Sequence, residues 1–287
     1  MANVLITGTS TGIGRETALH LARNGYTVFA SMRTPDRNPE LADTAAAENL
    51  PVTVLQQDVT DGDSNQAAVD RVVDNVGQID VLINNAGLGA AAVTEEMAMS
   101  ELRQLFETNF FGAVDLTKRV IPQMRERRGG AIVNVTSVAG RMSVSPQIAY
   151  SSSKVALDVV TEMWAQELER FGVRVAAIEP GIIVTPILEK FRSAGSGNEV
   201  CAALRAHDAL LRGRHPCGHQ APRSWPGRSR TPSKLIVRSF DIVGVDAVGI
   251  MQMRNSMSDE EWVAFFTEEM PLEKWKQKAA ALSGLPL

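Results

Sequence analysis

The residues best suited to chemistry lie in the middle of the chain. Tyr150 and Lys154 are four residues apart, so on a helix they share one face, one turn from each other. A phenol with a pKa of about 10 is a poor base at neutral pH, and a nearby ammonium stabilises the phenolate and lowers that pKa. Such a pair is a general acid/base suited to oxidising an alcohol or reducing a ketone. Alone, Tyr-x3-Lys is also a common surface pair.

Two further polar residues precede this pair. Ser137 stands thirteen residues before Tyr150, at the predicted end of a strand, where its hydroxyl could bind the substrate oxygen. Asn109 sits among apolar neighbours in a predicted helical region, residues 102–121. A buried amide must find partners or cost about 1–3 kcal/mol. Asn109 is therefore either a satisfied helix asparagine or a functional one.

These residues need a cofactor beside them, and the N-terminal stretch predicts one. Residues 7–14 (TGTSTGIG) follow a short apolar run at 3–6 and open a helical pattern that Gly25 ends. In such a turn the glycines let the backbone approach a diphosphate, while the helix N-terminus offers unpaired N–H groups to it. Glycine triads also occur in tight turns that bind no ligand.

The end of the second predicted strand, residues 27–32, bears on the choice of cofactor. An acid about 20 residues beyond the glycine turn would favour NAD by binding the ribose hydroxyls. Here Ser31 and Arg33 flank Met32, and a hydroxyl and a guanidinium suit a 2′-phosphate. Asp36 nearby keeps NAD possible. The sequence thus favours NADP. In the alternative interpretation, Arg33 is a solvated loop residue that binds no phosphate.

Six predicted strands alternate with helical patterns, which indicates an α/β fold with a doubly wound parallel sheet of the Rossmann type. The remaining strands cover 52–56, 79–83, 131–136 and 173–178. Asp58-Val59, Asn84-Asn85-Ala86-Gly87 and Pro180-Gly181 follow three of them. In such a sheet ligands bind beyond the carboxyl ends of the strands, where these residues and Ser137 are expected to lie.

Taken in order, these motifs make residues 7–185 resemble the short-chain dehydrogenase/reductase family. The Gly-x3-Gly-x-Gly spacing, the Asn-Asn-Ala-Gly tetrapeptide and the Ser137, Tyr150 and Lys154 set carry the resemblance. Residues 29–33, residues 85–89 and the tail near Asp246 lean toward the branch that contains the 17β-hydroxysteroid and retinol dehydrogenases.

The resemblance implies a role for each of these positions. Tyr150 would give or take the proton, Lys154 would tune its pKa and bind the ribose hydroxyls, and Ser137 would orient the substrate oxygen. Asn109 would hold a water that links Lys154 to solvent. The expected cofactor contacts are Gly8, Thr9, Ser10, Gly12, Ile13, Gly14, Ser31, Arg33, Asp58, Val59, Asn85, Ala86, Gly87, Tyr150, Lys154, Pro180, Gly181, Ile183 and Thr185.

Composition narrows the classes of partner. The chain has 287 residues, 44% of them hydrophobic, and a net charge of -4, which argues against a nucleic-acid partner. Two cysteines suggest no disulfide framework, and no apolar run of about 18 residues is present. We expect a cytoplasmic protein without a membrane partner or a metal, assembled as a homodimer or homotetramer.

The segment 193–240 differs in composition from the rest of the chain. It carries a net charge of +6, both cysteines and three of the four histidines. It is either a basic substrate lid without fixed structure, a metal site at residues 215–219, or a stretch read in a shifted frame. We therefore divide one domain into a dinucleotide-binding and catalytic core at 1–192, this segment, and a C-terminal completion at 241–287.

In the C-terminal part, residues 258–261 predict a capping box, followed by a helix with Trp262, Phe265 and Phe266.

Together these features predict an oxidoreductase that transfers a hydride between NADP(H) and a secondary alcohol or ketone. The substrate is expected to be apolar because Met142, Val144, Ile182 and Ile183 are near the predicted site. The alternative is a non-catalytic NAD(P)-binding redox sensor on the same fold, although such a protein has no need of Tyr150 and Lys154 together.

Overall fold

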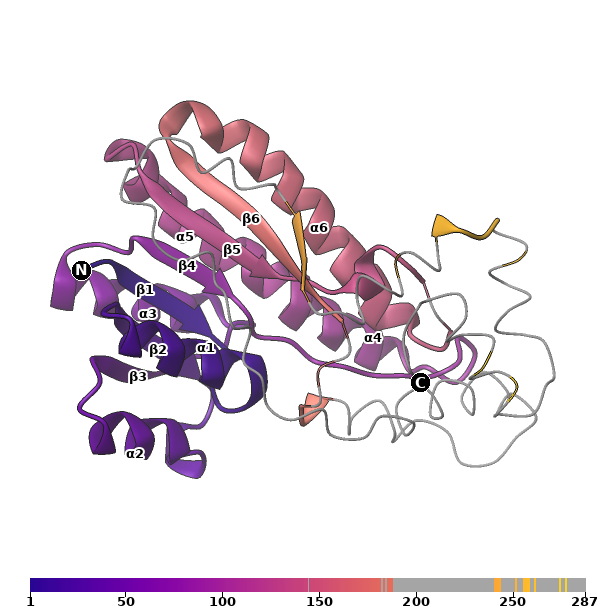
Figure 1. Ribbon diagram of the computed structural model, residues 1–287, viewed down its shortest axis with the longest axis horizontal. Coiled ribbons are helices and arrows are strands. Elements are labelled where there is room, and N and C mark those ends of the chain that lie inside the picture. Colours follow the sequence, from indigo (N-terminus) through magenta and orange to yellow (C-terminus); the bar gives the residue numbers. More distant parts are fainter. Residues whose placement is uncertain are drawn as a thin grey trace.

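A seven-stranded sheet, parallel throughout, forms the centre of the molecule in the computed structural model (Figure 1). The structure describes residues 1–143, 145–181, 183, 185–187, 240–243, 251, 255–258, 261, 274 and 277. The strand order is β3-β2-β1-β4-β5-β6-β7. The strands are β1 (Asn3–Thr7), β2 (Thr27–Met32), β3 (Val52–Gln56), β4 (Val81–Asn84), β5 (Gly130–Val135), β6 (Val173–Pro180) and β7 (Phe240–Val243).

This architecture confirms the predicted doubly wound parallel sheet. All six predicted strands are present, with ends that move by at most two residues. The chain builds outward from β1 to β3, then crosses back to place β4 on the other side of β1. In sheets of this kind the usual ligand-binding crevice lies at that reversal, beyond the carboxyl ends of β1 and β4.

Helices cover both faces of the sheet. On one face α1 (Gly12–Arg23) and α2 (Glu40–Ala47) pack on Val4, Ile6 and Val28. On the other face α3 (Gly62–Val76), α5 (Gly112–Glu126) and α6 (Ile148–Leu168) pack on Leu5 and Leu82, and Figure 1 shows α6 running along β6. Neighbouring residues of β1 thus face opposite cores, because side chains alternate along a strand.

Local sequence signals end the helices as predicted. Gly25 has φ +84° and follows α1, where the Gly25 and Tyr26 amides donate to the carbonyls of Ala22 (3.0 Å) and Leu21 (3.2 Å). This is a Schellman motif, which needs a left-handed residue that glycine adopts without strain. Gly77 ends α3 in the same left-handed region, with φ +82°.

The predicted helical region at 102–121 differs from expectation in one respect. It divides into α4 (Met99–Phe106), a π-helical turn η2 (Glu107–Phe111) and α5. Asn109 lies inside the π turn and is 1% exposed. Single π turns inside helices often mark functional positions, and hydrophobic spacing alone does not distinguish them from α-helix.

The C-terminal third is described only in part. Most of the basic segment 193–240, with the histidines and cysteines of the weighed metal site, lies outside the described residues, as do Trp262, Phe265 and Phe266. The predicted capping box is confirmed: the Ser258 amide donates to Glu261 Oε2 (2.8 Å), and the Glu261 amide donates to Ser258 Oγ (3.2 Å). β7 pairs with β6 at the sheet edge, and the division of the chain at 192 and 240 stays a prediction. Within the described part, none of the helices combines the length and apolar character needed to cross a membrane.

Candidate active site

The glycine turn after β1 lies tightly against the turn after β4. Gly8 has φ +70°, and a Cβ atom there would stand 2.6 Å from the Ala86 Cα atom. A Cβ atom on Gly14 would overlap both the Gly8 carbonyl oxygen and the Asn85 side-chain amide. Both positions therefore need glycine, because the two turns meet at backbone distance. The approach of this turn to a diphosphate stays a prediction.

The N-terminus of α1 is open to an anion. Its N-cap residue, Thr11, makes no side-chain hydrogen bond to the first turn, and that turn contains no acidic residue. The first N–H groups of a helix have no partner within the helix, so they remain available to a diphosphate. Thr185, which follows β6, lies over this turn, because a Cβ atom on Gly12 would stand 3.2 Å from Thr185 Cγ2. Ser10 and half-buried Ile13 lie in the same turn.

Asn85 holds β1 and β4 together at this crevice. Its side-chain amide donates to the carbonyls of Thr7 (2.8 Å) and Gly8 (3.0 Å). The backbone amides of Asn85 and Ala86 both donate to the Thr7 hydroxyl at 3.0 Å. The Asn85 side chain is thus engaged with the protein backbone and fixes the glycine turn, and its contact with a cofactor stays a prediction.

At the end of β2 the two residues expected near a 2′-phosphate differ in accessibility. The Ser31 hydroxyl is buried and donates to the Ile6 carbonyl (3.3 Å), while the Ser31 carbonyl accepts from the Thr9 amide and hydroxyl, both at 3.0 Å. Arg33 is exposed and has no ion-pair partner in the described part of the chain. Of the two side chains, that of Arg33 is accessible to a ligand, and its contact with a 2′-phosphate stays a prediction.

Beyond β3, Asp58 closes its own turn. Its carboxylate accepts hydrogen bonds from the Thr60 amide (3.0 Å) and the Thr60 hydroxyl (2.8 Å). This is the role of an Asp that opens a loop, and the expected contact of Asp58 with the cofactor stays a prediction. Val59, the next residue, is buried, and its carbonyl accepts from the Asn65 side chain (3.0 Å).

Helix α6 brings the three expected catalytic side chains together beside the crevice. Tyr150 and Lys154 lie one turn apart, and the Lys154 Nζ atom is 5.8 Å from the centre of the Tyr150 ring. Lys154 is buried and donates to the Val135 carbonyl at the end of β5 (2.8 Å). Ser137, two residues further, caps the 3-10 turn η3 (Val138–Gly140) and hydrogen-bonds the Tyr150 side chain.

The ionisation of this pair corrects the expectation from the sequence. Burial raises the pKa of Tyr150, opposed by the hydrogen bond with Ser137, and burial lowers the pKa of Lys154 to about 8. The Lys154 ammonium lies over the Tyr150 ring and donates to the Val135 carbonyl rather than to the phenol hydroxyl, so it does not cancel the rise that burial causes in the Tyr150 pKa.

Asn109 links three parts of the site through its side chain. Its Oδ1 atom accepts from the Leu88 amide (2.7 Å), and its Nδ2 atom donates to the Leu88 carbonyl and to Ser153 Oγ, both at 3.0 Å. The asparagine therefore joins the segment after β4 to α6. Asn109 is therefore a satisfied buried asparagine, with both Nδ2 hydrogens and one Oδ1 acceptor site used by protein groups. A water on Asn109 stays a prediction.

The other expected cofactor contacts follow the carboxyl ends of the strands. A Cβ atom on Gly87 would stand 3.7 Å from Lys154 Nζ, so Gly87 lies beside Lys154. Pro180 ends β6, and Gly181 and Ile183 follow it, with Ile183 40% exposed. Ile182 and Val144 lie outside the described residues.

Sequence reasoning missed three charged residues next to the lysine. Asp158, Glu179 and Arg141 gather behind Lys154, and the first two are 6% and 1% exposed. The available signal was Asp158 four residues after Lys154, which places both on one helix face. In the described part of the chain, no group of three or more histidine, cysteine, aspartate or glutamate side chains could hold a metal ion.

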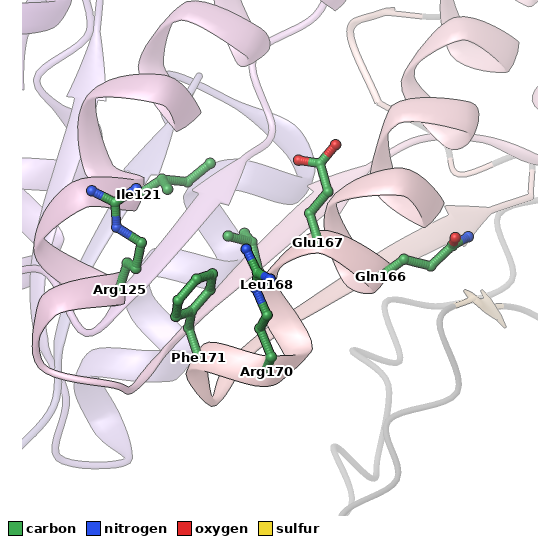
Figure 2. A pocket seen from close by; sticks show the side chains of 7 residues that line it. All are labelled: Ile121, Arg125, Gln166, Glu167, Leu168, Arg170 and Phe171. Carbon is green, nitrogen blue, oxygen red and sulfur yellow. The ribbon is translucent and has the colours of Figure 1, made fainter.

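A surface cavity of about 530 Å³ lies at the other end of the sheet. It sits where α5 and α6 end, just before β5 and β6 begin, as Figure 2 shows. Its lining residues are Ile121, Arg125, Gln166, Glu167, Leu168, Arg170 and Phe171. Since Tyr150 and Lys154 lie at the opposite, carboxyl end of the strands, this cavity is separate from the candidate active site.

Comparison with known proteins agrees with this geometry. The family model for short chain dehydrogenase matches residues 2–195. The chain is 41% identical over 187 residues to retinol dehydrogenase 8 of Bos taurus, covering 63% of this chain and 59% of that protein. It is 37% identical over 179 residues to 3-ketodihydrosphingosine reductase of Bacteroides thetaiotaomicron, covering 62% of each. The solved structure of ElxO with NADP bound is 32% identical, with a TM-score of 0.61 over 66% of this chain and 77% of that chain. The match thus spans about three fifths of the length of these two curated relatives.

Proposed function

Because this chain belongs to the short-chain dehydrogenase/reductase family, we propose that it is an NADP(H)-dependent oxidoreductase acting on a secondary alcohol or ketone. The observation that carries the proposal is the convergence of Ser137, Tyr150 and Lys154 at the carboxyl edge of the sheet. A nucleotide-binding protein without catalysis has no need for a buried lysine beside a hydrogen-bonded tyrosine–serine pair.

The crevice fits a dinucleotide by its backbone. The glycine turn leaves no room for side chains at Gly8 and Gly14, and the N-terminus of α1 offers uncapped N–H groups to a diphosphate. Arg33 would meet the 2′-phosphate of NADP through charge-assisted hydrogen bonds. ElxO, at 32% identity, has been solved with NADP bound, which supports the same choice here. NAD stays possible through Asp36.

The proposed mechanism divides the work among three side chains. Held in this crevice, a nicotinamide cofactor would supply or accept the hydride at the substrate carbon. In reduction the Tyr150 hydroxyl gives its proton to the substrate oxygen, and in oxidation the phenolate removes the proton from the alcohol. Ser137 donates a hydrogen bond to the same oxygen and holds it near Tyr150. Lys154, as an ammonium, stabilises the phenolate that proton transfer leaves behind.

We further propose an apolar substrate. Met142 is half-buried and Ile183 is 40% exposed, and both follow strands whose ends form the site. Retinol dehydrogenase 8 and 3-ketodihydrosphingosine reductase, both relatives of this chain, are named for substrates with long hydrocarbon chains. A panel of apolar ketones and aldehydes, with short polar ketones alongside, tests this preference.

The proposed assembly is a homodimer or homotetramer in the cytoplasm. Helix α6 carries three large apolar side chains that are about half exposed within one protomer. These are Val155 (38%), Val159 (52%) and Met163 (51%), spaced four residues apart on one face of α6. Light scattering of the full chain gives the mass that decides between one and several protomers.

The activity is tested by following the absorbance of reduced nicotinamide with NADPH and NADH over a carbonyl panel. Tyr150→Phe should lower kcat by about 100-fold or more, because it removes the general acid. Tyr26→Phe is the matched control, since Tyr26 is the other tyrosine of the chain. It lies at the amino end of β2, away from the carboxyl ends of the strands where Tyr150 lies. Equal turnover in Tyr150→Phe and wild type would refute this mechanism. Tight NADPH binding without turnover on any carbonyl would favour the redox sensor instead.

A further inference from the structure

A buried carboxylate lies one helical turn beyond the catalytic lysine. Asp158 follows Lys154 by four residues on α6 and is 6% exposed. Neither carboxylate oxygen has a hydrogen-bond partner in the described part of the chain. The Thr136 hydroxyl is close enough to lower the pKa of Asp158, yet it donates to the Ile178 carbonyl (3.2 Å). Buried polar atoms are nearly always hydrogen-bonded, so two bare oxygens on one carboxyl group need a physical reason.

The surrounding structure holds this carboxylate in place. Gly140, in the 3-10 turn that Ser137 caps, presses directly on it, since a Cβ atom on Gly140 would overlap Asp158 Oδ2. The same Cβ atom would stand 3.3 Å from the Lys154 carbonyl carbon, so Gly140 covers the turn that joins the two residues. The fit requires glycine and leaves the carboxylate little freedom.

Three charged groups face Asp158 from the elements around it. Arg141, after η3, forms an ion pair with Glu179 of β6 (Nε to Oε1 2.8 Å), so these two charges compensate each other. Lys154 on α6 is the third, and its ammonium has no other carboxylate acting on it. Glu179 and Arg141 act on Asp158 in opposite directions, and Asp158 and Lys154 are an anion and a cation in the same buried region.

The ionisation of the two residues follows from this arrangement. Burial raises the pKa of Asp158 to about 6, and Glu179 adds to the rise. The Thr136 hydroxyl, Arg141 and Lys154 lower it, in that order. Burial lowers the pKa of Lys154 to about 8, and the negative charge of Asp158 opposes that fall. At neutral pH the carboxylate is therefore charged, and it favours the charged form of the lysine.

We propose that Asp158 is a positioning residue that acts through Lys154, its carboxylate being the buried counter-charge that keeps Lys154 an ammonium beside Tyr150. The inference deepens the proposed function and rests on it for the catalytic role of Lys154. It explains why a carboxylate without hydrogen bonds is retained behind the site: its interaction is with a charge rather than with a donor.

The direct test is a titration of Lys154 in the full chain, followed by NMR of side-chain-labelled lysine and assigned with Lys154→Met. In Asp158→Asn we expect the Lys154 pKa to fall by about one pH unit, a tenfold change in the ratio of ammonium to amine. Glu179→Gln is the matched control, because it removes a buried anion of the same cluster that does not act on Lys154. A Lys154 pKa that is unchanged in Asp158→Asn, or falls equally in Glu179→Gln, overturns the proposal.

A second variant protects the test against a folding defect. Gly140→Ala keeps the carboxylate but displaces it from the turn after Lys154, so the Lys154 pKa should fall in the same direction by a smaller amount. If neither Gly140→Ala nor Asp158→Asn changes that pKa, the carboxylate is not the counter-charge. This readout needs no substrate, so its outcome is independent of the enzyme assay.

Once a carbonyl substrate is known, the pH dependence of kcat shows how Asp158 affects catalysis. The alkaline limb of kcat for ketone reduction should move to lower pH in Asp158→Asn and stay in place in Glu179→Gln. A purely structural role would lower kcat at every pH without moving the limb. Failure of the proposed function appears differently, as no turnover in the wild type, while the Lys154 titration still decides the role of Asp158.

Discussion

Replacing Asn109 with alanine should destabilise the protein and loosen the site together. The Asn109 side chain is 1% exposed and makes three hydrogen bonds, two with the Leu88 backbone and one with Ser153. They connect the π turn to the segment after β4 and to α6. Alanine can replace none of them, and water has little access to the groups it would leave.

The size of the effect follows from these contacts. Each intramolecular hydrogen bond contributes about 1 kcal/mol, so three give a loss of about 3 kcal/mol in the free energy of unfolding. For a chain of this size that loss lowers Tm by about 6–12 °C. Because Gly87, next to Leu88, lies beside Lys154, the affinity for NADPH should fall as well.

Urea unfolding followed by circular dichroism, with NADPH titration of the folded variant, measures both effects. The matched control is Asn75→Ala, an exposed helical asparagine whose amide donates only to the Arg71 carbonyl (2.6 Å). Exposed changes of this kind alter stability by about 0.5 kcal/mol or less. If Asn109→Ala unfolds at the same urea concentration as Asn75→Ala, the three hydrogen bonds do not stabilise this site.

Three further predictions concern the cofactor crevice and the buried acid. Arg33→Ala should raise the Kd for NADPH about 10- to 100-fold, because it removes a charge-assisted contact, and should leave the Kd for NADH unchanged. Fluorescence titration measures both constants. An equal rise in the Kd for NADPH and NADH would exclude a contact between Arg33 and the 2′-phosphate. Gly14→Ala should abolish cofactor binding in the same assay, because its Cβ atom overlaps the Gly8 carbonyl and the Asn85 side chain; wild-type affinity would show that the turn can adjust. The folded-state pKa of Asp158, about 6, exceeds the ordinary value, so the folded state binds more protons between about pH 4 and 6 and loses stability as pH rises through that window. In Asp158→Asn the free energy of unfolding should not show this fall of about 3 kcal/mol between about pH 4 and 6. Urea unfolding at several pH values measures it, and parallel curves for the wild type and the variant would contradict the prediction.

The order of the fold was predictable because its signals are local. Apolar runs identified the six strands, and Gly25 and Gly77 ended helices in left-handed conformations that few other residues adopt. Tyr150 and Lys154 could be placed on one face of a helix from their spacing alone. The π turn around Asn109 could not, because its hydrophobic spacing matches that of an α-helix.

The sequence by itself determined which groups are available: a phenol, an amine and a hydroxyl in the right order behind a glycine turn. Only the tertiary structure decided their states. Burial changes the pKa values of Tyr150 and Lys154, and Asp158 joins the site because η3 and β6 enclose it. Chain spacing fixes neighbours along a helix, whereas desolvation and charge pairing depend on atoms that meet only after the strands and helices have packed.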